Sequence, residues 1–186
     1  MIIILVGESA SGKTTLMNNF IQKHTDYRKA ISYTTRPPRD GEVDGVDYHF
    51  VSMDEFNRMA RNNQLLESAT YNGWNYGTTN GEFSGDNIIA VMNPAGMRAL
   101  ARAGIKFISV YLKVDRRTRL ISILNRGDNV DEACRRSIHD EGQFTNIEDE
   151  TNYVIRNNGF FKDEMRVLSE LESIVSECEK WQNECN

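Results

Sequence analysis

The first fifteen residues constrain the fold of this chain more than any other stretch. Ile2–Val6 is a continuous apolar run, which is typical of a strand covered on both faces. "GESASGKTT" at 7–15 follows it and matches G-x-x-x-x-G-K-[ST], a loop whose backbone N–H groups cradle phosphate at the start of a helix. We therefore expect a nucleoside triphosphate site, with the helix over about Lys13–Lys23.

The residues of this loop have separate chemical tasks. Gly7 and Gly12 let the backbone curl around the phosphate oxygens, and Lys13 reaches the β- and γ-phosphates. Thr14 offers its hydroxyl to Mg²⁺, the expected cofactor, which accompanies ATP. The predicted ATP-binding residues of the loop are Gly7, Glu8, Ser9, Ala10, Ser11, Gly12, Lys13, Thr14 and Thr15, with Thr14 as the metal ligand.

The rest of the chain alternates predicted strands and helices. Asn-Gly at 72–73 joins two strand-like runs and predicts a hairpin, and "SMDE" at 52–55 has the spacing of a helix-capping box. The C-terminal helix should bury Met165, Leu168, Leu171, Ile174 and Val175. Strands are predicted at 30–34, 65–71, 74–78, 88–92, 107–114 and 153–155, and further helices at 53–62, 94–103, 116–125, 130–143 and 162–179.

This order of elements favours one α/β domain. We expect a P-loop NTPase-type parallel sheet flanked by helices, with an inserted strand-rich nucleotide-binding lobe and a helical lid. The boundaries are about 1–30, 83–115 and 151–186 for the core, 31–82 for the lobe and 116–150 for the lid.

Charge and composition narrow the class of partner. The net charge of −5 argues against a broad basic face for nucleic acid, and no apolar stretch is long enough to cross a membrane. Three cysteines without C-x-x-C spacing indicate ordinary thiols in a reducing compartment. We therefore expect a cytoplasmic protein whose partners are nucleotides, while the sequence leaves monomer or homodimer open.

The polar segment "ISYTTRPPRDGEVDGVDYHF" at 31–50 has the character of an anion site. Arg36 and Arg39 lie three residues apart around two prolines, and a pair of guanidinium groups suits a doubly charged phosphate. Tyr48 and Tyr76 can each donate a hydroxyl hydrogen bond to the same group. In the alternative interpretation this segment is a solvated hairpin whose charges pair with each other.

The carboxylate of Glu67 indicates which base is attached to this phosphate. Guanine presents N1–H and N2–H₂ side by side, and one carboxylate can accept both hydrogen bonds, whereas adenine presents an acceptor at N1. Ser32 and Thr78 can meet the remaining guanine groups, such as O6. These residue types together favour guanine.

At these residues the chain resembles the guanylate kinase family. The resemblance rests on "SYTTRPPRDGEVDGVDYHF", "VSMDEF" and "LLESATYNGWNYGTT", is dense over 1–82, and continues weakly through "RG" at 126–127 and "YVIRNN" at 153–158. It implies lid arginines at Arg126 and Arg136, and Asn157 near the adenine of ATP. The GMP-binding residues that it implies are Ser32, Arg36, Arg39, Tyr48, Glu67, Tyr76 and Thr78.

The expected activity is ATP-dependent phosphorylation of GMP, dGMP or both to the diphosphate. Lys13, Arg39, Arg126 and Arg136 are the expected catalytic residues because they can stabilise charge on the transferred group. Two alternatives stay open. One is a related P-loop kinase with a different nucleotide or a sugar phosphate as acceptor, and the other is a non-catalytic binding module of guanylate-kinase type.

The chain also departs from the family pattern. Val91 and Asn93 stand where acidic residues are usual, so Asn93 either contacts guanine or a metal-bound water, or only caps the next helix. Ser122 stands where another lid arginine is usual, and Arg119, on the same predicted helix face as Arg126, could substitute for it. The segment between 78 and 88 is short for the helix usual there.

Overall fold

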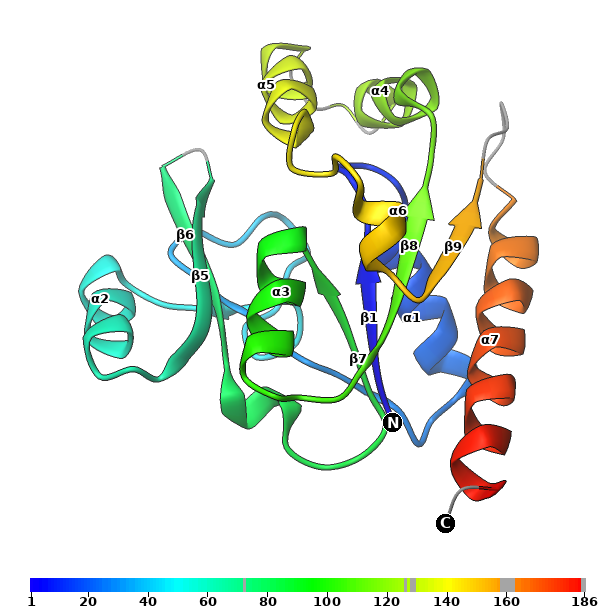
Figure 1. Cartoon of the computed structure of the whole chain (residues 1–186). Helices are drawn as coiled ribbons and strands as arrows, with labels where there is room; N and C mark the ends of the chain where they lie inside the picture. The colour runs from blue at the N-terminus through cyan, green and yellow to red at the C-terminus, as the bar shows by residue number, and fades with distance from the viewer. Residues whose placement is uncertain (72, 126, 128–129, 158–162, 185–186) are drawn as a thin grey trace.

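The structure of the protein is a computed structural model that describes residues 1–71, 73–125, 127, 130–157 and 163–184 (Figure 1). Two sheets organise it. One is five-stranded and central, and the other is four-stranded and lies to one side of it. No helix in these ranges is both long enough and apolar enough to cross a membrane.

The central sheet is entirely parallel and has the strand order β2-β7-β1-β8-β9. This confirms the predicted α/β fold with a P-loop strand at its centre. The strands are β1 (Ile2–Val6), β2 (Arg28–Lys29), β7 (Ile88–Met92), β8 (Ile108–Lys113) and β9 (Tyr153–Arg156).

Helices cover both faces of this sheet, which explains the unbroken apolar run of β1. Successive side chains of a strand point to opposite faces. Ile3 and Leu5 therefore pack against α1 (Lys13–Lys23) and α7 (Glu164–Glu184), while Ile4 and Val6 pack on the side of α3 (Pro94–Arg102) and α6 (Ile147–Glu150). All four side chains are fully buried, and each such burial contributes about 1.5–3 kcal/mol.

The second sheet has the order β4-β3-β6-β5 and forms the inserted lobe. Its hairpin occurs as predicted, and Gly73 in the turn has a φ of +77°, a backbone conformation that glycine adopts without strain. The predicted capping box also forms, since the Ser52 hydroxyl accepts a hydrogen bond from the Glu55 amide. The elements are β3 (Tyr33–Thr34), β4 (His49–Phe50), α2 (Met53–Arg61), β5 (Leu65–Tyr71) and β6 (Trp74–Thr79).

Two helices correspond to the predicted lid. They are α4 (Arg116–Asn125) and α5 (Val130–Asp140), and both lie beyond the carboxyl end of β8 (Figure 1). In a parallel α/β sheet this edge is where ligands bind. The lid therefore lies at the same edge as the loop that follows β1.

Several predicted elements differ from the structure. The strand expected at 30–34 is divided, because the chain leaves the central sheet after β2 and joins the lobe only at β3. Helix α5 ends at Asp140 rather than 143, and the unpredicted α6 follows. A short 3₁₀ helix, η1 (Asn80–Phe83), occupies part of the segment between β6 and β7.

The prediction that Met165 faces the core is wrong. Its side chain is 84% exposed, while Val167, which the prediction omitted, is buried beside Leu168 and Leu171. The buried stripe of α7 therefore begins at Val167 rather than at Met165. Helix α7 also continues to Glu184, beyond the predicted end at 179.

Candidate functional site

The loop between β1 and α1 has the tight curl that its sequence predicts. Gly12 precedes α1 with a φ of 97°, and Ala10 has a φ of 61°. A Cβ atom on Gly7 would lie 2.7 Å from Ser11 Oγ and 2.9 Å from the carbonyl oxygen of Leu112. Glycine is therefore required at this position, because the backbone of β8 passes too close for any side chain.

The ammonium group of Lys13 lies across this loop. Its Nζ donates hydrogen bonds to the carbonyl oxygens of Gly7 and Glu8 at 2.6 and 2.8 Å, and to Ser11 Oγ at 3.3 Å. A Lys ammonium has three donors on a flexible stem. A bound phosphate can therefore recruit the group with a short movement.

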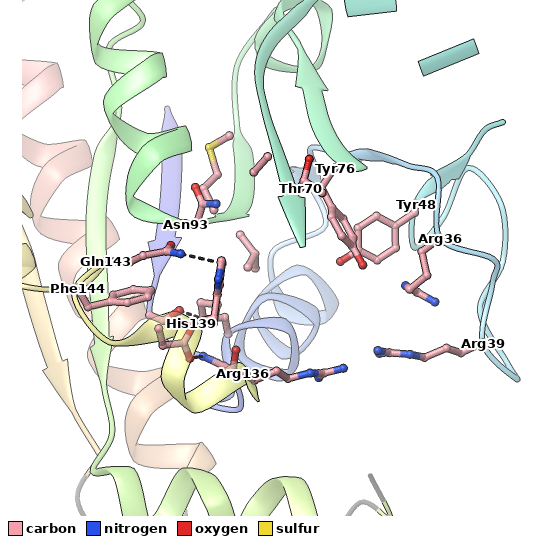
Figure 2. Close-up of a pocket in the computed structure, with 17 residues that line it drawn as sticks. Arg36, Arg39, Tyr48, Thr70, Tyr76, Asn93, Arg136, His139, Gln143 and Phe144 are labelled. Atoms are coloured by element: carbon pink, nitrogen blue, oxygen red, sulfur yellow. Dashed lines mark hydrogen bonds between the residues drawn. The ribbon is translucent and has the colours of Figure 1, made fainter. Parts of the chain in front are cut away.

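A cavity of about 300 Å³ lies between this loop, the lobe and the lid (Figure 2). Its volume is within the range of small-molecule sites. The predicted site residues that line it are Gly7, Ser9 and Lys13 from the loop, Arg36, Arg39, Tyr48 and Tyr76 from the lobe, Arg136 from the lid, and Asn93. The fold thus brings the phosphate loop and the paired arginines to one cavity.

The two arginines of the lobe have different surroundings. Arg36 is buried, and its Nη2 donates to both oxygens of Glu42 at 2.8 and 2.9 Å while Nη1 donates to the Pro37 carbonyl at 2.8 Å. Arg39 is exposed, and among the described residues its guanidinium has no acidic partner. Internal pairing, the alternative interpretation of this segment, therefore applies to Arg36 and not to Arg39.

Arg39 and Arg136 come from separate elements and extend toward each other across the cavity (Figure 2). Two cationic side chains facing one cavity create a positive potential between them. An anion between the two would receive charge-assisted hydrogen bonds from both.

Tyr48 and Tyr76 lie beside these arginines, with ring centroids 6.0 Å apart. The Arg36 guanidinium carbon lies 5.5 Å from the centroid of the Tyr48 ring. Burial, followed by the proximity of Tyr76, raises the pKa of Tyr48 above its usual value. The Tyr48 hydroxyl is therefore kept as a protonated hydrogen-bond donor, as its predicted role requires.

Ser32, Thr78 and Glu67 form a hydrogen-bonded chain in the lobe. Ser32 Oγ lies 2.8 Å from Thr78 Oγ1, which donates to Glu67 Oε1 at 3.1 Å. Burial raises the pKa of Glu67, and hydrogen bonds from Thr78 oppose this effect. The three residues do not line the cavity, but Glu67 and Thr78 are cross-strand partners two positions from Ala69 and Tyr76, which do.

Asn93 caps a helix and also lines the cavity. Its Oδ1 accepts a hydrogen bond from the Gly96 amide at 2.8 Å, so the expected cap of α3 is present. Val91 lines the cavity as well. Of the residues described as lining it, only Asp140 carries a carboxylate, and that residue comes from the lid and not from β7.

Asn157 lies in a second, smaller pocket. It is buried, and its backbone N–H donates to the Lys113 carbonyl at 2.9 Å. This pocket includes Ser11, Gly12 and Thr15 of the loop and shares no residue with the larger cavity. The loop therefore separates two hollows, one beside Asn157 and one beside the arginines.

The donors at the start of α1 fit a Mg²⁺ ion that arrives with its nucleotide. Thr14 is exposed there, and its hydroxyl is a hard oxygen ligand. Mg²⁺ usually keeps several waters and takes its other ligands from phosphates and one or two side chains. The described residues include no group of three or more acidic, histidine or cysteine side chains that could hold a metal.

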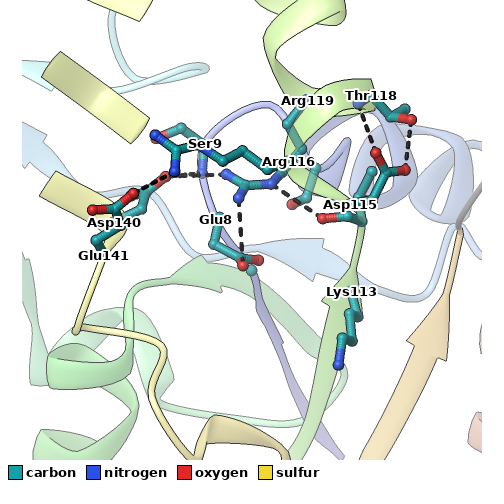
Figure 3. A network of polar contacts seen from close by, with 12 residues as sticks. Glu8, Ser9, Lys113, Asp115, Arg116, Thr118, Arg119, Asp140 and Glu141 are labelled. Atoms are coloured by element: carbon teal, nitrogen blue, oxygen red, sulfur yellow. Dashed lines mark hydrogen bonds and ion pairs between the residues drawn. The ribbon is translucent and has the colours of Figure 1, made fainter. Parts of the chain in front are cut away.

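The sequence also singled out two other arginines of the lid, Arg126 and Arg119. Arg126 lies outside the described residues. Arg119 is buried and faces the phosphate loop, with Nη2 at 3.7 Å from Glu8 Oε1 and Nη1 at 3.6 Å from Asp140 Oδ2 (Figure 3). Its Nε donates to the Val114 carbonyl. Arg119 thus connects the loop and the lid rather than lining the cavity.

Sequence reasoning missed the cavity residues at the end of the lid. His139, Asp140, Gln143 and Phe144 all line it. Their local pattern is that of an ordinary amphipathic helix end. Asp140 accepts a hydrogen bond from the Ser9 amide, 131 residues earlier in the chain, and no local sequence pattern predicts such a contact.

Comparisons with known proteins point to a single family. A family model described as Guanylate kinase matches residues 1–177. The guanylate kinase of Nostoc sp. is 33% identical over 165 residues, covering 86% of this chain and 83% of that protein. The guanylate kinase of Geobacter sulfurreducens is 32% identical over 181 residues, covering 94% and 87%.

A solved structure shows the same fold. The crystal structure of guanylate kinase from Anaplasma phagocytophilum superposes with a TM-score of 0.69 at 20% sequence identity, covering 95% of this chain and 85% of that one. The likeness extends over nearly the whole chain and shows the shared fold.

Proposed function

The chain belongs to the guanylate kinase family, and from this membership we propose that it transfers the terminal phosphoryl group of ATP to GMP, dGMP or both. The observation that carries the proposal is the shared cavity, where the phosphate loop meets Arg36, Arg39 and Arg136. Two anion-binding groups on one cavity suit a reaction between two phosphorylated substrates.

ATP binds with its phosphates on the loop at 7–15. The backbone amides and the start of α1 receive the phosphate oxygens. Lys13 leaves the carbonyls of Gly7 and Glu8 to contact the terminal phosphates, and Asn157 lies on the adenine side. Mg²⁺, held by the phosphates and the Thr14 hydroxyl, would neutralise phosphate charge.

GMP binds in the lobe. Arg36, Arg39, Tyr48 and Tyr76 surround its phosphate, and Tyr48 remains a donor because its pKa is raised. The chain of Ser32, Thr78 and Glu67 meets the guanine edge, with the Glu67 carboxylate accepting from N1–H and N2–H₂. Asn93 Oδ1 caps α3 by accepting from the Gly96 amide. Asn93 can therefore contact the base only through its Nδ2 donors and the second lone pair of Oδ1.

The phosphoryl transfer needs positioning and charge stabilisation rather than a general base. An oxygen of the GMP phosphate is already anionic, and it forms a bond to the γ-phosphorus of ATP. The bond from that phosphorus to the β–γ bridging oxygen breaks, and ADP keeps the electron pair. Lys13, Arg39, Arg136 and Arg126 stabilise the charge on the transferred group, in a site from which the lid excludes water.

Acceptor selectivity tests this function. ADP release should be measured with GMP, dGMP, AMP, UMP, dTMP and a sugar phosphate, beside an ATP titration without acceptor. GMP and dGMP should give the highest kcat/KM. Preference for AMP would contradict the guanine assignment, and preference for the sugar phosphate would favour the different-acceptor kinase. Absence of ATP binding would favour the binding module.

A further inference from the structure

A carboxylate of the lid accepts a hydrogen bond from one backbone amide of the phosphate loop. The Ser9 backbone N–H donates to Asp140 Oδ2 at 2.7 Å (Figure 3). Asp140 is the last residue of α5, and its side chain is only 10% exposed. The loop amides are the groups that receive phosphate oxygens, so Asp140 stands where an anionic oxygen of the nucleotide would bind.

Arg119 holds this carboxylate in place. Its guanidinium lies between Asp140 Oδ2 at 3.6 Å and Glu8 Oε1 at 3.7 Å, and Tyr111 donates its hydroxyl to Glu8 Oε2. The side chains of Arg119, Glu8 and Asp140 are each 15% exposed or less, so solvent screens these charges only weakly. The contact of Asp140 with the loop is therefore part of a buried ionic network.

Asp140 lies where the terminal phosphate of a bound triphosphate would lie. Ser9 and Lys13 line the large cavity, where the acceptor phosphate binds, while Ser11 and Gly12 line the small pocket beside Asn157. A triphosphate with its nucleoside at the small pocket therefore points its terminal phosphate at the large cavity. Asp140 lines that cavity too, so the two anions meet there.

A carboxylate oxygen and a phosphate oxygen cannot both occupy the Ser9 amide. In addition, two like charges in contact repel each other strongly where water is partly excluded. ADP, which ends at its β-phosphate, leaves the contact of Asp140 with Ser9 undisturbed. The hydrogen bond between Asp140 and Ser9 therefore weakens the binding of ATP but not the binding of ADP.

We propose that Asp140 determines how strongly the loop distinguishes ATP from ADP, by occupying the Ser9 amide until the terminal phosphate displaces it. Displacement releases the end of α5 from the loop, so arrival of the terminal phosphate frees the lid helix that carries Arg136. This inference rests on the proposed placement of ATP on the loop. It adds a nucleotide-specificity residue that the loop motif does not contain.

The direct test is calorimetric titration of the whole protein with ATP and with ADP, at fixed Mg²⁺ and without acceptor. Asp140→Asn removes the charge and keeps the shape. We expect ATP to bind about tenfold more tightly and ADP to change less than about twofold. Glu141→Gln is the matched control, because it removes the neighbouring charge, which pairs with Arg116 on the exposed surface. It should alter neither affinity by more than about twofold.

A second measurement separates failure of this inference from failure of the proposed function. Hydrogen exchange at the Ser9 amide in nucleotide-free protein should be slow, and Asp140→Ala should accelerate it, whether or not ATP binds the loop. Exchange at Ser9 that is equally fast in both proteins would overturn the proposal. So would equal tightening of ATP and ADP in Asp140→Asn, or weaker ATP binding. Wild-type protein that binds neither nucleotide would instead contradict the proposed function.

Discussion

Glu42 holds the guanidinium of Arg36 through two hydrogen bonds, of 2.8 and 2.9 Å, that both come from Nη2. The pair is largely buried, with 9% of the Arg36 side chain and 19% of the Glu42 side chain exposed. Glu42 also accepts a hydrogen bond from the Arg39 amide at 2.7 Å. One carboxylate therefore orients the buried arginine and fixes the turn that carries the exposed one.

Removal of Arg36 should reduce both stability and GMP affinity. Arg36→Ala leaves Glu42 partly buried without its partner, which should lower the free energy of unfolding by about 2–3 kcal/mol. Arg39→Ala should weaken GMP binding with little change in stability, since Arg39 is exposed. Denaturant unfolding and GMP titration measure the two effects.

Adding Glu42→Gln to Arg36→Ala is the control for this prediction. It removes the uncompensated charge, so it should recover part of the stability and none of the GMP affinity. Equal stability of the two single arginine variants would contradict the energetic role of the Arg36–Glu42 pair.

The raised pKa of Glu67 should make GMP binding sensitive to acid. Guanine needs the ionised carboxylate, and burial raises the pKa of Glu67 above 4.5. Affinity should therefore be complete above this raised pKa and decline as the pH falls through it. Kd for GMP against pH, compared with Glu67→Gln, isolates this effect from titration of the GMP phosphate. The same acid dependence in the Gln variant would refute the assignment.

Lys13→Ala should abolish most of the turnover. Lys13 is the cationic side chain of the phosphate loop. Loss of one charged group that stabilises the transferred phosphoryl group lowers kcat by a factor of about 10²–10³. Thermal unfolding should change little, since the hydrogen bonds from Lys13 Nζ to Gly7, Glu8 and Ser11 all lie within its own loop. Lys23→Ala, at an exposed ion pair with Glu172, is the control and should retain full turnover. Wild-type turnover of the Lys13 variant would remove the loop from the mechanism.

Gly7→Ala should abolish ATP binding. The new Cβ would lie 2.9 Å from the Leu112 carbonyl oxygen, a backbone atom of β8 that cannot move away alone. Gly81→Ala is a matched control, because the nearest atom to its Cβ would be Thr79 Oγ1 at 3.8 Å. ATP titration of both variants should show loss of binding only at position 7. Normal affinity in Gly7→Ala would mean that the loop can rearrange.

Asn93 substitutions should distinguish its cap from a role in the cavity. Asn93→Ala removes the hydrogen bond to the Gly96 amide and should cost about 1 kcal/mol of stability. Asn93→Asp should keep the cap, because aspartate is an equally good helix cap. If the cap is its whole role, GMP affinity will be unchanged in both variants, as calorimetric titration would measure. A loss of affinity in the stable Asp variant would assign Asn93 a role in binding the base.

The sequence alone determined the parallel core, the phosphate loop and the lobe hairpin. These depend on signals between near neighbours: the apolar run at Ile2–Val6, the spacing of Gly7, Gly12 and Lys13, and Asn-Gly at 72–73. The resemblance of residues 32–79 to a family pattern also predicted which side chains of the lobe would gather near the loop. Errors occurred at element ends, as at Met165, where packing against the sheet decides which turn is buried.

The tertiary structure alone decided which charges meet. Arg119 lies between Glu8 of the loop and Asp140 of the lid, and Asp140 accepts a hydrogen bond from the Ser9 amide. Residue spacing along the chain cannot give these pairings, because the phosphate-loop partners, Glu8 and Ser9, lie more than a hundred residues before Arg119 and Asp140. Their distances depend on how the lid helices pack over the sheet, and electrostatic energy depends on distance and burial rather than on order in the sequence.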